Sequence, residues 1–119
     1  MRKAIVLSAA VSCALTLAAV WSFGLAALPV KVALENAHVR VSEVTYNPGV
    51  PRERSIRATD QIIVFLNDCR YERTDSTTHE KTIRERKSGD VIWHNKGEDA
   101  PQLINLGSKP YRTLVIELK

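Results

Sequence analysis

The sequence predicts a small all-β domain, built as a barrel or a sandwich, over residues 35–119. Roughly six to eight short strands follow one another in this range, separated by Gly, Pro, Asn and Asp at the spacing typical of such folds. No stretch of the range has helical periodicity. Residues 1–30 differ in composition and are predicted to be a separate export segment, which leaves about 90 residues for one domain with a modest core.

The N-terminal segment begins with Arg2 and Lys3 and continues as an apolar run without charge until Lys31. A short basic start followed by an apolar stretch is typical of a signal peptide, and the small residues Gly24, Ala26 and Ala27 supply a cleavage region. The run over residues 4–30 also exceeds the roughly 20 residues that a membrane-spanning helix needs, so an uncleaved membrane anchor is the alternative. Either interpretation predicts an exported domain, periplasmic or secreted.

Charge and cysteine content restrict the partners of the domain. Without Arg2 and Lys3, 15 basic residues stand against 13 acidic ones, a net charge of about +2. The signs alternate along the chain and form no basic stripe, so no nucleic-acid partner is predicted. Cys13 lies in the export segment and Cys69 in the domain, so the domain has no internal disulfide. Cys69 is interpreted as a small, half-buried side chain at a strand end rather than a reactive thiol.

The strands of the domain are predicted from alternation and turn residues. Residues 39–41 and 44–46 alternate in opposite phase, which predicts a bulge or bend at residues 42–43, and the break at residues 47–51 ends this strand. Residues 61–66 form a short, largely apolar run rich in β-branched residues, which indicates a strand buried on both faces. A polar pair of strands around a turn at 75–77 indicates an exposed hairpin. The remaining strands are expected, in order, at residues 69–73, 81–86, 91–93, 102–106 and 111–118.

Five segments of the domain resemble a small single-domain cupin. The segments are Pro48-Gly49, residues 62–66, Gly89-Asp90-Val91-Ile92-Trp93, Asn105-Leu106-Gly107 and the closing residues 115–119. The resemblance covers residues 35–119 and implies a double-stranded β-helix, or jelly-roll, barrel. It also implies where a metal site would lie, because members that bind metal hold it with a His-x-His pair, a Glu and a further His inside the barrel.

The implied metal-ligand positions hold other residues in this chain. Counted from Gly49, the two histidine positions fall on Ser55 and Arg57 and the glutamate position on Gln61; counted back from Asn105, the last histidine position falls on Pro101. Proline has no side-chain donor atom, and the fixed charge of arginine repels a cation. The resemblance therefore implies a cupin without a metal ion or other cofactor, because a lone histidine at position 94 cannot form a site of three ligands.

The interpretation that the sequence favours is a barrel that binds a small anionic molecule. If Arg57 and Gln61 point inward, they line a polar pocket, and Trp93 is expected to form an apolar wall of it. A planar guanidinium in such a pocket suits a carboxylate or a phosphate. The alternative for Arg57 is an ion pair with Asp60, or contact with solvent at the mouth of the barrel.

Two other functions remain open from the sequence. One is an enzyme, either of the metal-dependent dioxygenase or isomerase class with a non-standard site, or an acid–base enzyme that uses His94 with Asp60 or Glu98. The other is a structural or self-associating module that forms a homodimer through an edge strand of its sheet.

Overall fold

The structure is a computed structural model that describes residues 28–119. Within this range the chain forms strands β1 to β11 and contains no helix. The predicted signal peptide or membrane anchor falls on residues 1–30, of which all but the last three lie outside the described residues. Between residues 28 and 119 no helix is long and apolar enough to span a membrane.

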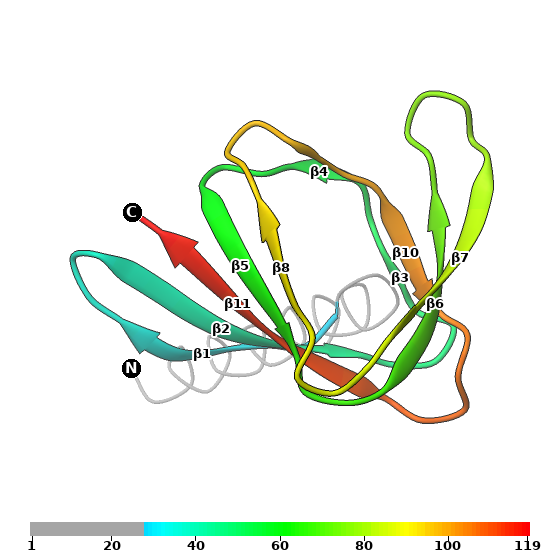
Figure 1. Ribbon diagram of the computed structural model, residues 1–119, viewed down its shortest axis with the longest axis horizontal. Helices are drawn as coiled ribbons and strands as arrows, with labels where there is room; N and C mark the ends of the chain where they lie inside the picture. Colours follow the sequence, from blue (N-terminus) through cyan, green and yellow to red (C-terminus); the bar gives the residue numbers. More distant parts are fainter. Residues whose placement is uncertain (1–27) are drawn as a thin grey trace, which may run out of the picture.

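Two sheets face each other and form the barrel (Figure 1). The five-stranded sheet has the strand order β1-β2-β11-β5-β8, and its strands are Val30–Glu35, Val39–Tyr46, Tyr111–Leu118, Asp60–Phe65 and Val91–His94. The four-stranded sheet has the order β3-β10-β6-β7, and its strands are Pro51–Arg52, Gln102–Asn105, Cys69–Thr74 and Lys81–Arg86. A short pair, β4 (Ser55–Ile56) with β9 (Asp99–Ala100), connects the two sheets at the upper edge of Figure 1.

An aromatic cluster fills one end of the barrel. Its buried members come from both sheets: Tyr46, Ile63, Phe65, Tyr71 and Tyr111. The rings of Tyr46 and Tyr111 stack with their centroids 4.6 Å apart. Offset stacking of this kind adds about 0.5–1.5 kcal/mol to the free energy gained from burial. Because its members are buried and pack on one another, this cluster forms the core of the barrel.

Register sets a polarity gradient along the inner face of the five-stranded sheet. In β11 the inward residues run from Tyr111 through Thr113 and Val115 to Glu117, and they are flanked by Phe65 at the aromatic end and by Gln61 at the other end. Because strand side chains alternate between faces, every second residue contributes to this wall. The barrel therefore has an aromatic, buried end and a polar end.

Three features of the fold differ from the sequence-based predictions. The first strand, Val30–Glu35, was not predicted, because its alternation merges with the apolar run before it. The bulge expected at residues 42–43 lies instead in β1, between Val32 and Leu34, while β2 stays in regular register with β11. The apolar residues of β2 change phase because they occupy both faces of one continuous strand.

The third difference concerns β5, which was predicted to be buried on both faces and is buried on one. Gln61, Ile63 and Phe65 are buried on the inner face, whereas Ile62 and Val64 are half-buried on the outer face. The outer face is apolar in two adjacent cross-strand rows. The first row is Leu34, Val41, Ile116, Ile62 and Trp93, and the second is Leu114, Val64 and Val91.

Candidate functional site

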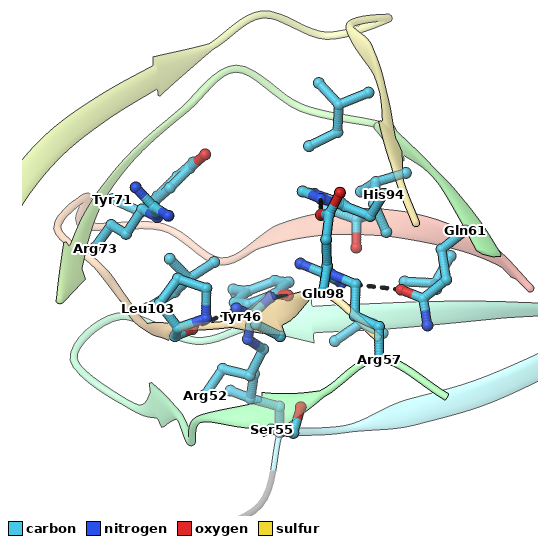
Figure 2. Close-up of a pocket in the computed structure, with 18 of the residues that line it drawn as sticks. Tyr46, Arg52, Ser55, Arg57, Gln61, Tyr71, Arg73, His94, Glu98 and Leu103 are labelled. Atoms are coloured by element: carbon cyan, nitrogen blue, oxygen red, sulfur yellow. Dashed lines mark hydrogen bonds and ion pairs between the residues drawn. The ribbon is translucent and has the colours of Figure 1, made fainter. Parts of the chain in front are cut away.

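The space between the two sheets is a cavity of about 710 Å³, and Figure 2 shows residues that line it. Both sheets and the β4–β9 pair contribute side chains to its lining. Its volume lies in the range of roughly 300–1,000 Å³ that is typical of small-molecule sites. The interior of the barrel is therefore the candidate site.

The four positions derived from the cupin motif all line this cavity. Ser55 comes from β4, Arg57 from the turn before β5, Gln61 from β5, and Pro101 from the residue between β9 and β10. Positions counted along the motif therefore lie together in the lining of one cavity. Whether they bind a ligand stays a prediction.

Trp93 does not line the cavity, and the prediction that it forms the apolar wall was wrong. Its side chain is 50% exposed on the outer face of the five-stranded sheet, and its indole Nε1 donates to Asn95 Oδ1 at 2.9 Å. Alternation along β8 places Ile92 and His94 in the cavity instead. Ile92 therefore supplies the apolar contact that was assigned to Trp93.

Arg57 is held inside the cavity by its backbone and by one side-chain contact. Its N–H donates to the carbonyl of Glu98 at 2.9 Å, and its own carbonyl accepts from Gly97 N at 2.8 Å. Its Nη1 donates to Gln61 Oε1 at 2.9 Å, a contact drawn as a dashed line in Figure 2. Its buried Nε has no partner among residues 28–119. The predicted alternative, an ion pair with Asp60, is absent from the described residues, because Asp60 accepts instead from the Lys96 N–H at 2.8 Å.

A second arginine places its charge beside the first. Arg52 donates from Nη2 to the backbone carbonyl of Pro101 and from Nη1 to the Tyr46 hydroxyl at 3.5 Å, while its buried Nε has no described partner. Burial lowers the pKa of Arg57, and the positive charge of Arg52 lowers it further. Arginine stays protonated in proteins even so, so the two side chains keep two like charges close together in the cavity.

Three further arginines line the cavity from the polar hairpin, which was predicted to be exposed to solvent. They are Arg73 on β6 and Arg84 and Arg86 on β7. The guanidinium of Arg86 lies 5.7 Å from the centroid of the Phe65 ring, and its Nε donates to the Tyr71 hydroxyl at 3.4 Å. The signal that would have found them is their spacing by two residues, which places Arg84 and Arg86 on one face of their strand.

The predicted acid–base group at His94 pairs with Glu98 rather than with Asp60. His94 Nδ1 lies 2.7 Å from Glu98 Oε2, and both side chains line the cavity. The hydrogen bond with His94 is the main cause that lowers the pKa of Glu98. Glu98 also accepts from Asn95 Nδ2 at 3.1 Å, so the carboxylate is held from two sides at the polar end of the cavity.

The residues at the cupin ligand positions do not fit a metal ion. Arg57 places a fixed positive charge at one of the positions, and Pro101 uses its backbone carbonyl to bind Arg52. Among residues 28–119 no group of three or more His, Cys, Asp or Glu side chains is arranged to hold a metal ion. We therefore assign no reaction step to a metal.

Comparison with known proteins supports the fold. No protein-family model and no curated protein sequence matches the chain. Among solved structures, a cupin domain from Bordetella pertussis Tohama I is similar, with a TM-score of 0.69 and 18% identity over 79% of this chain and 95% of that one.

Two other solved structures are similar at lower scores. A Cupin 2 conserved barrel domain protein from Salinispora arenicola has a TM-score of 0.57 and 18% identity, over 75% of this chain and 73% of that one. The polyketide cyclase RemF from Streptomyces resistomycificus has a TM-score of 0.62 and 14% identity, over 76% of this chain and 64% of that one. Together with the facing sheets and the central cavity, these similarities show that residues 28–119 have the cupin fold.

Proposed function

We propose that the protein is an exported binding protein that holds a small anionic molecule inside its barrel, without a metal ion. The observation that carries this proposal is the state of Arg57. Its guanidinium lies in the cavity, one of its nitrogens is buried without a partner, and no described carboxylate forms an ion pair with it. A half-buried guanidinium that forms no ion pair gains from an anionic partner, so an anionic ligand would stabilise this arrangement.

Gln61 prepares Arg57 to bind such a ligand. The hydrogen bond from Arg57 Nη1 to Gln61 Oε1 fixes one edge of the guanidinium and leaves the other N–H groups free to donate. A carboxylate or a phosphate accepts two parallel hydrogen bonds from this planar group. Export is supported by the basic start and apolar run of residues 1–30.

The proposal is tested by calorimetric titration of the purified full chain with benzoate and with inorganic phosphate. We expect binding of at least one of these anions and a loss of roughly tenfold or more in affinity for Arg57→Gln, because a charge-assisted hydrogen bond contributes about 1.5–3 kcal/mol. Arg112→Gln is the matched control, because Arg112 is exposed on the outer face in an ion pair with Glu43 at 2.8 Å. Failure of both anions to bind, or an equal loss in both variants, would contradict the proposal.

Self-association is the second candidate function, and the outer face of the five-stranded sheet favours it. Leu34, Val91 and Trp93 are exposed at the two sides of this apolar face. Charges at its margin are already paired, as in Arg112–Glu43 at 2.8 Å and Lys119–Glu35 at 2.9 Å. A second copy, related by a two-fold axis, would therefore meet an apolar centre and a neutralised rim. The contact would involve the sheet face, rather than the edge strand expected from the sequence.

Sedimentation velocity on the full chain tests this second candidate. We expect a dimer for the native chain and a monomer for Trp93→Glu. Ile83→Glu is the control, because Ile83 is exposed on the four-stranded sheet. A native chain that sediments as a monomer, or a Trp93→Glu variant that still dimerises, would exclude this face as the contact.

A further inference from the structure

The two walls of the cavity differ in chemistry. The five-stranded sheet supplies apolar and aromatic side chains over most of its inner face, with Gln61 and His94 at the polar end. The inner face of the four-stranded sheet is basic. We call its members the arginine wall: Arg52, Arg73, Arg84 and Arg86.

Strand register fixes the spacing within the arginine wall. Leu103 on β10 is paired with Arg52 on one side and with Arg73 on the other. Neighbouring strands lie about 4.8 Å apart, so the backbones at Arg52 and Arg73 are roughly 10 Å apart. Arg84 is paired with Tyr71, two residues before Arg73 on β6, so it lies one inward-facing row nearer the aromatic end. The wall therefore offers donors at two separated places rather than at one point.

No described carboxylate neutralises the wall. The acidic residues that line the cavity either bind groups outside the arginine wall or lie on the opposite sheet. Glu98 binds His94, and Asp99 binds Arg54 at 2.7 Å together with the Ser76 hydroxyl. Glu53 accepts from Gln102 Nε2 at 3.4 Å, and Glu117 lies beside Gln61 on the opposite sheet. Within residues 28–119, none of these carboxylates forms an ion pair with an arginine of the wall.

The arginines of the wall differ in whether their guanidinium groups already have hydrogen-bond or ion-pair partners. Arg86 lies over the Phe65 ring and bonds the Tyr71 hydroxyl, and Arg52 bonds Pro101, so both are partly occupied. The side chains of Arg73 and Arg84 form no hydrogen bond or ion pair that the described part of the chain shows. These two therefore remain free to donate to a ligand.

We infer that the ligand carries two separate anionic groups joined by an apolar body, an inference that rests on the proposed function. One group binds at Arg57, next to Arg52, and the other binds at Arg73 and Arg84 across the cavity. Figure 2 shows Arg73 on the opposite side of the cavity from Gln61, the partner of Arg57. The half-buried side chains of Leu103, Ile92 and Val115, which pack on the aromatic cluster, contact the body between the two groups.

The inference is tested by calorimetric titration of the full chain at constant ionic strength with benzoate, benzene-1,3-dicarboxylate and benzene-1,4-dicarboxylate. We expect at least one dicarboxylate to bind about tenfold or more tightly than benzoate, because a second charge-assisted contact forms. Arg73→Gln and Arg84→Gln should each reduce this advantage, because each lowers the affinity for the dicarboxylate more than the affinity for benzoate. Arg70→Gln is the matched control, because Arg70 is the neighbouring, outward-facing arginine of β6.

The outcomes separate this inference from the proposed function. If benzoate binds and Arg57→Gln weakens it, but no dicarboxylate binds more tightly, the ligand has one anionic group and the present inference fails alone. The same conclusion follows if the advantage survives in both the Arg73→Gln and the Arg84→Gln variants. If none of the three acids binds, the present inference fails, and the proposed function fails with it only if inorganic phosphate does not bind either. Arg84 is exposed, so the Arg84→Gln variant keeps the test decisive if Arg73→Gln does not fold.

Discussion

Replacement of Thr113 by valine should stabilise the ligand-free protein. Thr113 lies in the middle of the five-stranded sheet, is 2% exposed, and its Oγ1 has no hydrogen-bond partner among the described residues. A buried hydroxyl without a partner costs about 1–3 kcal/mol. Valine has nearly the same shape, keeps the branched Cβ that suits a strand, and removes this cost. We therefore expect the free energy of unfolding to rise by about 1–2 kcal/mol.

Urea denaturation of the native chain and of Thr113→Val measures this change. The slope of the free energy against urea should stay the same, and the midpoint should rise. In a thermal scan, the same change corresponds to a rise in Tm of roughly 4–8 °C for each kcal/mol in a domain of this size. Thr82→Val is the matched control, because Thr82 is exposed on β7 and the same substitution there should change stability by less than about 0.5 kcal/mol.

A loss of stability in Thr113→Val would refute the reasoning. It would show that the Thr113 hydroxyl has a hydrogen-bond partner, such as an ordered water molecule in the cavity that Thr113 lines. If the variant is more stable but binds benzoate more weakly, the hydroxyl serves the ligand at the expense of the empty protein. That combination would show that the Thr113 hydroxyl contributes to ligand binding rather than to the stability of the fold.

Three further predictions address other parts of the domain. Burial raises the pKa of Cys69 to about 11. Iodoacetamide at pH 8 should therefore modify the Cys69 thiol on the order of a hundredfold more slowly in the folded chain than in the urea-unfolded chain. Equal rates in the two states would contradict this prediction. Because the raised pKa belongs to the folded state, the stability contributed by this thiol is present below its ordinary pKa and is lost as the pH rises toward 11. Trp93→Ala should leave benzoate affinity within about twofold, since the side chain is outside the cavity; a tenfold loss in titration would return Trp93 to the site. Asn105→Ala should lower the free energy of unfolding, measured by urea denaturation, by about 2–4 kcal/mol. The reason is that the buried amide of Asn105 donates to two backbone carbonyls and accepts from one backbone N–H. A change below about 1 kcal/mol would show that these hydrogen bonds contribute little to stability.

The location of the site could be predicted from the sequence because it depends on counting along a motif with fixed spacing. Counting from Gly49 and from Asn105 placed Arg57, Gln61 and Pro101 in the cavity lining. Both reference residues have structural reasons for their identity. Gly49 has a φ of 73°, a backbone conformation that favours glycine, and Asn105 binds the backbone of Gly107 and Lys109 in the turn that follows it.

The composition of the walls could not be predicted in the same way, because it depends on which face of each strand meets the cavity. A shift of one residue in phase exchanges the two faces, and this exchange separates Trp93 from its neighbours Ile92 and His94. The hairpin of β6 and β7 was interpreted as solvated because it is rich in arginine, glutamate and lysine, and arginine and glutamate alternate along residues 84–86. In the structure, that alternation separates inward-facing Arg84 from outward-facing Glu85.

The proposed binding of anions follows from the arginines that line this cupin barrel in place of the usual metal ligands. A metal ion would concentrate positive charge at one point and leave open coordination positions for a substrate. Here Arg57 occupies one of the ligand positions, and Pro101 turns its carbonyl to Arg52. The positive charge is thereby spread over planar groups that donate hydrogen bonds but do not coordinate. Under the proposed function, such a cavity would select ligands by the spacing and the shape of their carboxylates or phosphates. The distance between the anionic groups, rather than the presence of a metal, should then decide what this barrel binds.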